Sequence, residues 1–222
     1  MLDNEQLEQI QKKLQKNITS KRYCHTIGVM HTSISMAMRY GADLQQAALA
    51  GLLHDCAKCL DDKEMLRQCD KYDIPCNKTE KKQPYLLHAK LGACYAAQKY
   101  GVEEDAVCSA IRYHTTGRPG MSLLEAIVFT ADYIEPNRKM LEHLPVIRKM
   151  AFIDLEEAVY MILRDTVEYL GKGDKEKTDQ IEHHTLEAYD YYKRLHEARR
   201  LIITAQKGKF YGTVKENGIN RL

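Results

Sequence analysis

Apolar residues recur at the three- and four-residue spacing of an α-helix from one end of this 222-residue chain to the other. No stretch shows the strict alternation of a half-buried strand, and no hairpin turn joins two such stretches. A chain that offers only helical faces must bury them against other helices. The pattern therefore predicts an all-α fold, and the length suits one domain with one substantial core.

Capping residues divide the first quarter of the chain into three expected helices. The first follows Asp3, the second opens at Ser20 and ends at Gly41, and the third follows Asp43 and runs to about Lys58. The second helix has an apolar stripe, formed by Ile27, Met30, Ile34 and Met38.

The rest of the chain alternates helices with turn-forming segments. We expect a short helix around 63–69, an exposed loop to Pro84, and then helices at about 85–100, 103–113, 123–135, 155–170 and 178–205. Two of these helices begin with capping boxes, Ser122 with Glu125 and Asp154 with Glu157. The residues after Ala205, which include three glycines, are expected to form a loose tail.

Charge is balanced over the chain but not along it. Lysine and arginine number 33 against 31 aspartates and glutamates, which excludes an overall basic field for non-specific binding of nucleic acid. Residues 193–222, however, hold eight basic side chains and two acidic ones. We divide the chain into a domain of residues 1–192 and a basic C-terminal extension of residues 193–222. Such an extension is usually only solvated, and contact with RNA is the alternative.

The cysteines and the N-terminal residues predict the redox state of the thiols and the cellular compartment. Seven cysteines are scattered without an even framework, which favours reduced thiols in the cytoplasm. Residues 1–16 lack the basic start and apolar core of an export signal. No run approaches the roughly 20 apolar residues that a bilayer requires, so we expect no membrane partner.

Six potential metal ligands fall at or near the ends of expected helices: His25, His54, Asp55, His88, His114 and Asp132. Any one of them alone is more often a core or surface residue than a ligand. The adjacent pair His54-Asp55 is the most informative, because its neighbours are small or apolar and a carboxylate there requires a cation to compensate it. Asp132 lies on an apolar helix and requires a cation in the same way.

Cationic and hydroxyl side chains accompany these ligands. Lys58 follows Asp55, Thr115, Thr116 and Arg118 follow His114, and Arg138 follows Asp132. Cations and hydroxyls beside a metal site are the groups that a polyphosphate substrate requires.

The pattern of His25, then His54-Asp55, then Asp132 resembles the HD superfamily of metal-dependent phosphohydrolases. Three longer strings are more specific: HDCAK (54–58), HTTGRPGMS (114–122) and ADYIEPNR (131–138). Together they resemble the bacterial HD branch that cleaves diadenosine tetraphosphate symmetrically into two ADP. The resemblance covers roughly residues 18–190. The chain departs from it at Ala126, where relatives often have lysine, and in the basic extension.

The resemblance implies a helical bundle with two metal ions, often iron, between its helices; manganese, cobalt or zinc would also suit imidazole and carboxylate ligands. His25, His54, Asp55 and Asp132 would hold one ion, and His88, His114 and the bridging Asp55 would hold the other. The implied reaction is attack by a hydroxide that the two metals share. The expected catalytic residues are Asp55, Lys58 and His114, and the expected phosphate binders are Lys58, Thr115, Thr116, Arg118 and Arg138.

Alternatives remain open at this point. The chain could be an HD phosphohydrolase for another nucleotide, or a non-catalytic nucleotide-binding regulatory module. A homodimer is also open. Cys56 and Cys59 form a C-x-x-C without a second pair, which we interpret as coincidence. We expect the remaining histidines to be surface or packing residues, and Tyr189, Tyr191 and Tyr192 to cover the last helix.

Overall fold

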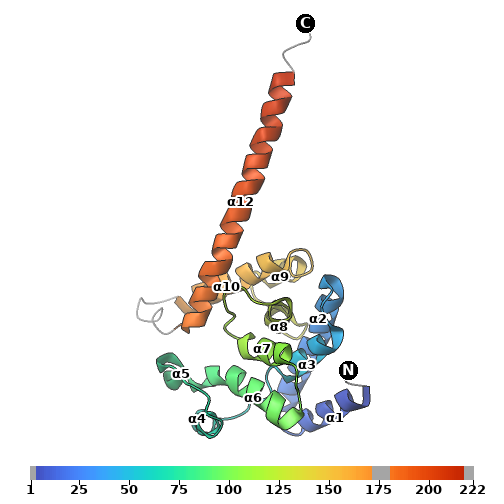
Figure 1. Cartoon of the computed structure of the whole chain (residues 1–222), viewed down its shortest axis with the longest axis vertical. Coiled ribbons are helices and arrows are strands. Elements are labelled where there is room, and N and C mark those ends of the chain that lie inside the picture. Colours follow the sequence, from blue (N-terminus) through green and yellow to red (C-terminus); the bar gives the residue numbers. More distant parts are fainter. Residues whose placement is uncertain (1–3, 172–180, 218–222) are drawn as a thin grey trace.

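The computed structural model describes residues 4–171 and 181–217, and every regular element in these ranges is a helix. In chain order the elements are α1 (Asn4–Gln15), α2 (Ser20–Tyr40), α3 (Leu44–Leu53), α4 (Asp62–Lys71), α5 (Lys78–Lys82), the 3-10 helix η1 (Pro84–Leu87), α6 (His88–Tyr100), α7 (Asp105–Tyr113), α8 (Leu123–Ile134), α9 (Leu144–Met150), α10 (Leu155–Gly171) and α12 (His183–Asn217). The all-α prediction is confirmed. Figure 1 shows α1 to α10 gathered in a bundle and α12 extending from it as a long rod.

The middle of the bundle is formed by α2, α3, α7 and α8. α2 packs on α3 and α8, and α3 also contacts α7 and α8. The core between them contains fully buried aliphatic residues such as Leu52, Leu53 and Ile127, each of which stabilises the fold by about 1.5–3 kcal/mol. A Cβ on Gly51 would lie 2.9 Å from the Cα of Met30. The backbones of α2 and α3 therefore approach closely near the end of α3, just before His54.

Most helix ends lie where the capping residues predict them. The Asp43 carboxylate accepts hydrogen bonds from the backbone N–H groups of Gln45 and Gln46 at the start of α3. Ser122 and Glu125 form the expected capping box at the start of α8. Gly41 ends α2 with φ of 75°, a left-handed conformation that glycine adopts without strain. The cap expected at Asp3 lies outside the described residues.

Between α2 and α9, three local predictions are wrong and one helix was not expected. α3 ends at Leu53 instead of Lys58, because residues 54–59 form tight turns that direct the His54-Asp55 pair inward. The loop expected before Pro84 contains α5, which Asn77 and the buried Glu80 cap reciprocally. α9 was not expected, because its seven residues are too few for a clear period. On α2, Met30 is buried and Ile27 and Ile34 pack against the core as expected, but Met38 is 63% exposed. Val29, Met36 and Ala37 are also buried, because α2 contacts both α3 and α8.

α12 packs against α10 without a break at the expected domain boundary of 192/193. Tyr192 is buried, and its hydroxyl accepts a hydrogen bond from the backbone N–H of Met121. Beyond the boundary, His196 contacts Glu157 at 2.8 Å and Arg199 contacts Asp154 at 2.9 Å.

The prediction of a loose tail after Ala205 is wrong as far as Asn217, because α12 continues to that residue. An internal glycine weakens a helix by only about 1 kcal/mol relative to alanine and does not by itself end it. None of the described helices is long and apolar enough to span a membrane.

Candidate metal centre

All six predicted ligands face one small volume between the central helices. They are His25 on α2, His54 and Asp55 directly after α3, His88 at the start of α6, His114 directly after α7, and Asp132 on α8. Ligand atoms of these residues lie within 4.8 Å of one another in three overlapping groups: His25, His54 and Asp55; His54, His114 and Asp132; and Asp55, His88 and His114. Segments far apart in the sequence thus contribute to one cluster.

Asp55 lies between two pairs of histidines, and its two oxygens face different pairs. Oδ2 lies 3.4 Å from Nε2 of His54 and 3.8 Å from Nε2 of His25. Oδ1 lies 3.2 Å from Nε2 of His88 and 3.5 Å from Nε2 of His114. A carboxylate in this position can contribute one oxygen to each of two adjacent cation sites.

Asp132 completes one side of the cluster. Its Oδ1 lies 3.0 Å from Nε2 of His25 and 3.8 Å from Nε2 of His54. The His25–His54 side therefore contains two imidazoles and two carboxylates, whereas the His88–His114 side contains two imidazoles and the shared carboxylate of Asp55. The two sides are chemically different.

All four histidines present Nε2 to the centre and hold Nδ1 in a hydrogen bond on the outside. The Nδ1 partners are the Glu135 carboxylate for His25 (3.0 Å), and the backbone carbonyls of Gly51 for His54 (2.7 Å), Tyr85 for His88 (2.5 Å) and Ile111 for His114 (2.7 Å). An acceptor at Nδ1 selects the tautomer that carries its proton there, which leaves the Nε2 lone pair free to bind a metal.

The protonation states also suit ligands. Burial alone raises the pKa of Asp55, but the surrounding imidazoles more than offset this and lower it well below its usual value. The pKa of Asp132 is lowered for a similar reason, with His25 and Arg138 as the main contributors. Burial and the ammonium of Lys58 lower the pKa of His88 to about 4. Metal ligands must be deprotonated, and Asp55, Asp132 and His88 meet that requirement at neutral pH. His54 differs, because burial lowers its pKa but the carboxylates of Asp55 and Asp132 more than offset this and raise it.

This donor set fits metal ions of the transition series. Four imidazole nitrogens and two carboxylates converge, and their outer hydrogen bonds already fix their orientation. Such a mixture suits iron, manganese, cobalt or zinc better than magnesium, which prefers oxygen ligands and water.

Three cationic side chains lie beside the cluster. Arg22 Nη1 donates to Asp55 Oδ2 at 2.6 Å, and Arg138 Nη2 donates to Asp132 Oδ1 at 2.8 Å. Lys58 Nζ lies 3.0 Å from Nε2 of His88, and burial lowers the pKa of this lysine. Lys58 and Arg138 were predicted near the site, but Arg22 was not.

The residues after His114 divide into two groups. The Thr115 hydroxyl lies 3.1 Å from Nε2 of His88 and 3.0 Å from Nε2 of His114, directly at the cluster. Thr116 bonds to the Gly117 carbonyl and lines a neighbouring cavity. Arg118, in contrast, is bound by the buried carboxylate of Glu125 at 2.9 Å. Its guanidinium therefore anchors the loop to the start of α8 in this structure.

Two residues at the cluster were missed by the sequence interpretation, although the spacing carries a signal for both. Arg22 lies three residues before His25 on α2, and Glu135 lies three residues after Asp132 at the end of α8. Residues three apart on a helix share a face, so both could have been placed next to a ligand. Glu135 is 1% exposed, and the Asn137 backbone N–H donates to its other oxygen.

Other ligand-type residues lie apart from this cluster. Cys56 is buried with its thiol donating to the Gly92 carbonyl, whereas Cys59 is exposed, so the two do not form a joint site. Glu182, His183 and His184 form a fourth group of potential ligand atoms at the start of α12. Glu182 already accepts hydrogen bonds from Asn77 and the His184 backbone, which accounts for its burial.

Residues 22–137 match the sequence pattern of the HD domain family. This part of the chain contains all six clustered residues. The chain belongs to the HD domain family. A relative in Bacillus subtilis is 40% identical over 72% of this chain and 84% of its own length, and one in Halalkalibacterium halodurans is 44% identical over 78% of this chain and 90% of its own. Both relatives are symmetrical bis(5'-nucleosyl)-tetraphosphatases.

A solved structure shares the architecture. It is a predicted HD superfamily hydrolase involved in NAD metabolism from Clostridium acetobutylicum, with a TM-score of 0.78 and 36% sequence identity. The match covers 84% of this chain and 96% of that one. The similarity therefore extends beyond the residues that the domain model matches.

Proposed function

We propose that this chain is a symmetrical bis(5'-nucleosyl)-tetraphosphatase, which hydrolyses diadenosine tetraphosphate to two ADP. Relatives that are 40% and 44% identical over most of their length carry out this function. The observation in the structure that supports it most directly is Asp55, whose two oxygens face two separate pairs of imidazoles. That arrangement provides for two adjacent cations, which hydrolysis of a highly charged phosphate chain favours.

Two metal ions would be held as follows. His25, His54, Asp55 and Asp132 would hold one, and Asp55, His88 and His114 would hold the other; iron is the first candidate, with manganese, cobalt and zinc as the alternatives. When bound, such ions neutralise phosphate charge and make water a nucleophile near neutral pH.

The side chains around the cluster bind and orient the phosphates. Lys58, Arg138 and Arg22 can each donate charge-assisted hydrogen bonds to non-bridging oxygens, at about 1.5–3 kcal/mol per contact. The Thr115 hydroxyl lies where a phosphate oxygen beside His114 would accept its proton. Arg118, bound by Glu125, holds the loop that carries Thr115 and Thr116 in place.

Cleavage at the centre of the substrate requires that these contacts select the middle of the phosphate chain. Water attacks the second phosphorus from one end, the central P–O–P bond breaks, and the departing ADP takes the bridging oxygen. His114 lies beside Thr115 and could reach that oxygen, although its Nε2 faces the metal cluster. We therefore rank its role as a ligand first.

Product analysis tests this proposal. Full-length protein, loaded in turn with iron, manganese, cobalt and zinc, is incubated with diadenosine tetraphosphate, and the products are separated by chromatography. We expect ADP as the only product, with about two metal ions per chain in the active form. AMP plus ATP would contradict symmetrical cleavage. Turnover of only another nucleotide, or none of any nucleotide, would favour the other HD activities or a regulatory module.

We also propose a location for the enzyme. The cysteines in the described ranges are all unpaired, which favours a reducing compartment such as the cytoplasm. Contact of the basic residues 193–222 with RNA and assembly into a homodimer remain predictions.

A further inference from the structure

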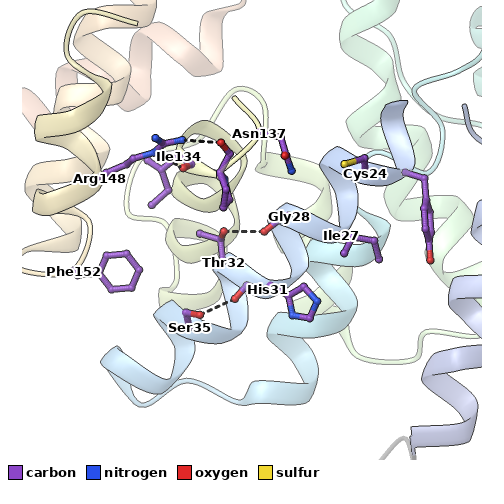
Figure 2. Close-up of a pocket in the computed structure, with 12 residues that line it drawn as sticks. Cys24, Ile27, Gly28, His31, Thr32, Ser35, Ile134, Asn137, Arg148 and Phe152 are labelled. Atoms are coloured by element: carbon purple, nitrogen blue, oxygen red, sulfur yellow. Dashed lines mark hydrogen bonds between the residues drawn. The ribbon is translucent and has the colours of Figure 1, made fainter. Parts of the chain in front are cut away.

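A large cavity lies next to the metal centre and is not used by the chemistry described above. Its volume is about 920 Å³, and it lies between α2 and the segments after α8 and α9 (Figure 2). Its lining includes Ile27, His31, Ile134, Arg148 and Phe152. The volume is within the range of about 300–1,000 Å³ that is typical of small-molecule sites.

The cavity adjoins a groove that contains the phosphate-binding candidates. The groove measures about 700 Å³ and is lined by Arg22, His25 and Arg138, among others. Cys24 and Asn137 line both spaces, so the cavity and the groove meet at these two residues. In Figure 2, Cys24 and Asn137 lie toward one end of the cavity and Phe152 toward the other. A bound molecule can therefore extend from the cavity to His25, the candidate metal ligand that lines the groove.

The charge of the cavity differs from that of the groove. Four cationic side chains line the groove: Lys21, Arg22, Arg138 and Lys139. Within the described chain, its one carboxylate is that of Glu135, which His25 and the Asn137 backbone N–H already engage. Among the described residues that line the cavity, Arg148 is the one lysine or arginine, and its guanidinium donates to the carbonyls of Ile134 (2.9 Å) and Glu135 (2.8 Å). Both bonds hold the turn after α8, so this guanidinium has a structural role at the cavity. The cavity thus suits an uncharged group, and the groove suits phosphate.

The walls of the cavity suit a flat, largely apolar group with a few polar edges. Phe152 is 38% exposed at the rim, and its segment is fixed because Arg39 donates to the Phe152 carbonyl and the Tyr40 hydroxyl donates to the Ala151 carbonyl. A fixed, exposed ring beside a cavity is a surface on which a nucleobase can stack.

Two polar side chains at the cavity retain their hydrogen-bonding capacity. The hydroxyls of Thr32 and Ser35 donate to backbone carbonyls of α2. The His31 imidazole and the Asn137 amide, in contrast, have no hydrogen-bond partner among the described residues. They can read the edge of a base or a ribose hydroxyl.

We infer that this cavity binds the nucleoside at one end of the dinucleoside tetraphosphate, with the phosphate chain passing Cys24 and Asn137 into the groove of Arg22 and Arg138. The inference rests on the proposed function and specifies its substrate binding. Phe152 and Ile27 contact the base, and His31 and Asn137 supply polar contacts. These residues determine specificity for a nucleoside over bare polyphosphate.

Binding of ADP and of inorganic pyrophosphate to the metal-loaded full-length protein separates the two subsites. By titration calorimetry, Phe152→Ala should bind ADP about tenfold more weakly, because a stacking contact is lost, while its pyrophosphate affinity stays within about twofold of wild type. Ser35→Trp, an exposed position on α2, should obstruct the cavity with the same result. Arg138→Ala should weaken both ligands. Ile153→Ala is the matched control, since Ile153 adjoins Phe152 but does not line the cavity.

Kinetics provide a second measurement. Phe152→Ala should raise KM for diadenosine tetraphosphate about tenfold with little change in kcat, because the reacting phosphates are untouched. ADP affinity within about twofold of wild type in either Phe152→Ala or Ser35→Trp would overturn the inference, as would an equal loss of pyrophosphate binding. Failure of the proposed function would differ: wild-type protein would then not cleave diadenosine tetraphosphate at all.

Discussion

The metal centre and the nucleoside cavity share α2 and the turn after α8, yet they are built in opposite ways. At the centre, every imidazole is held by an outer acceptor and both carboxylates have cationic neighbours. In the cavity, the His31 imidazole and the Asn137 side-chain amide have no hydrogen-bond partner in the part of the chain that the structure describes, and the walls are largely apolar. A ligand cluster requires particular side chains in fixed orientations, whereas a nucleoside site requires mainly shape. The first can be found as a motif, and the second becomes visible only after folding.

The largest expected effect comes from the residue that joins the two halves of the centre. Asp55→Ala should lower kcat/KM for diadenosine tetraphosphate by more than about a thousandfold, or about 4 kcal/mol, because both cation sites lose a ligand. Metal content measured by elemental analysis should fall as well, while circular dichroism retains the helical signal. Asp70→Ala, an exposed aspartate on α4, is the control. Substantial turnover by Asp55→Ala would refute the two-cation arrangement.

An intermediate loss of metal affinity or activity is expected at Gly28 and Glu135, which lie between the metal centre and the cavity. A Cβ on Gly28 would clash with Oε2 of Glu135, the carboxylate that holds Nδ1 of His25. Gly28→Ala should displace Glu135 and lower metal affinity or activity about 10- to 100-fold, the range usual for an outer partner of a ligand. Glu135→Gln should act in the same direction without adding bulk.

Metal titration and the ADP binding assay together give the measurement for Gly28→Ala. Met38→Ala, on the exposed part of α2, should behave as wild type. Loss of ADP binding with full metal affinity in Gly28→Ala would show that Gly28 affects the cavity alone. The role of Glu135 in orienting His25 would then be refuted.

The smallest effect is expected from the end of α12, which is distant from both regions (Figure 1). A chain truncated after Ile202 retains His196 and Arg199, which contact Glu157 on α10 and Asp154 directly before it. Its kcat/KM should stay within about twofold of wild type, and its Tm should change by no more than a few degrees. If these residues bind RNA, a salt-sensitive shift in an RNA-binding assay should be lost on truncation. A large loss of activity would show instead that they support the site.

Much of the candidate centre could be predicted because its chemistry restricts residue type. His54 and Asp55 stand together among small and apolar neighbours, and such a carboxylate implies a cation before any coordinates are known. Glu135 and Arg22 were accessible in principle from their three-residue spacing to a ligand. For Arg118, sequence proximity to His114 could not reveal that Glu125 binds its guanidinium.

By itself, the sequence determined the helical class of the chain, most helix ends and the six residues that cluster at the candidate centre, because periodicity, capping and ligand chemistry are properties of local residue types. Only the tertiary structure decided that α3 stops at Leu53, that Met38 on α2 is exposed, and that a cavity beside Phe152 meets the groove of Arg138. These features depend on how helices distant in sequence pack against one another. No local pattern records that packing, because side chains from several helices set its free energy together.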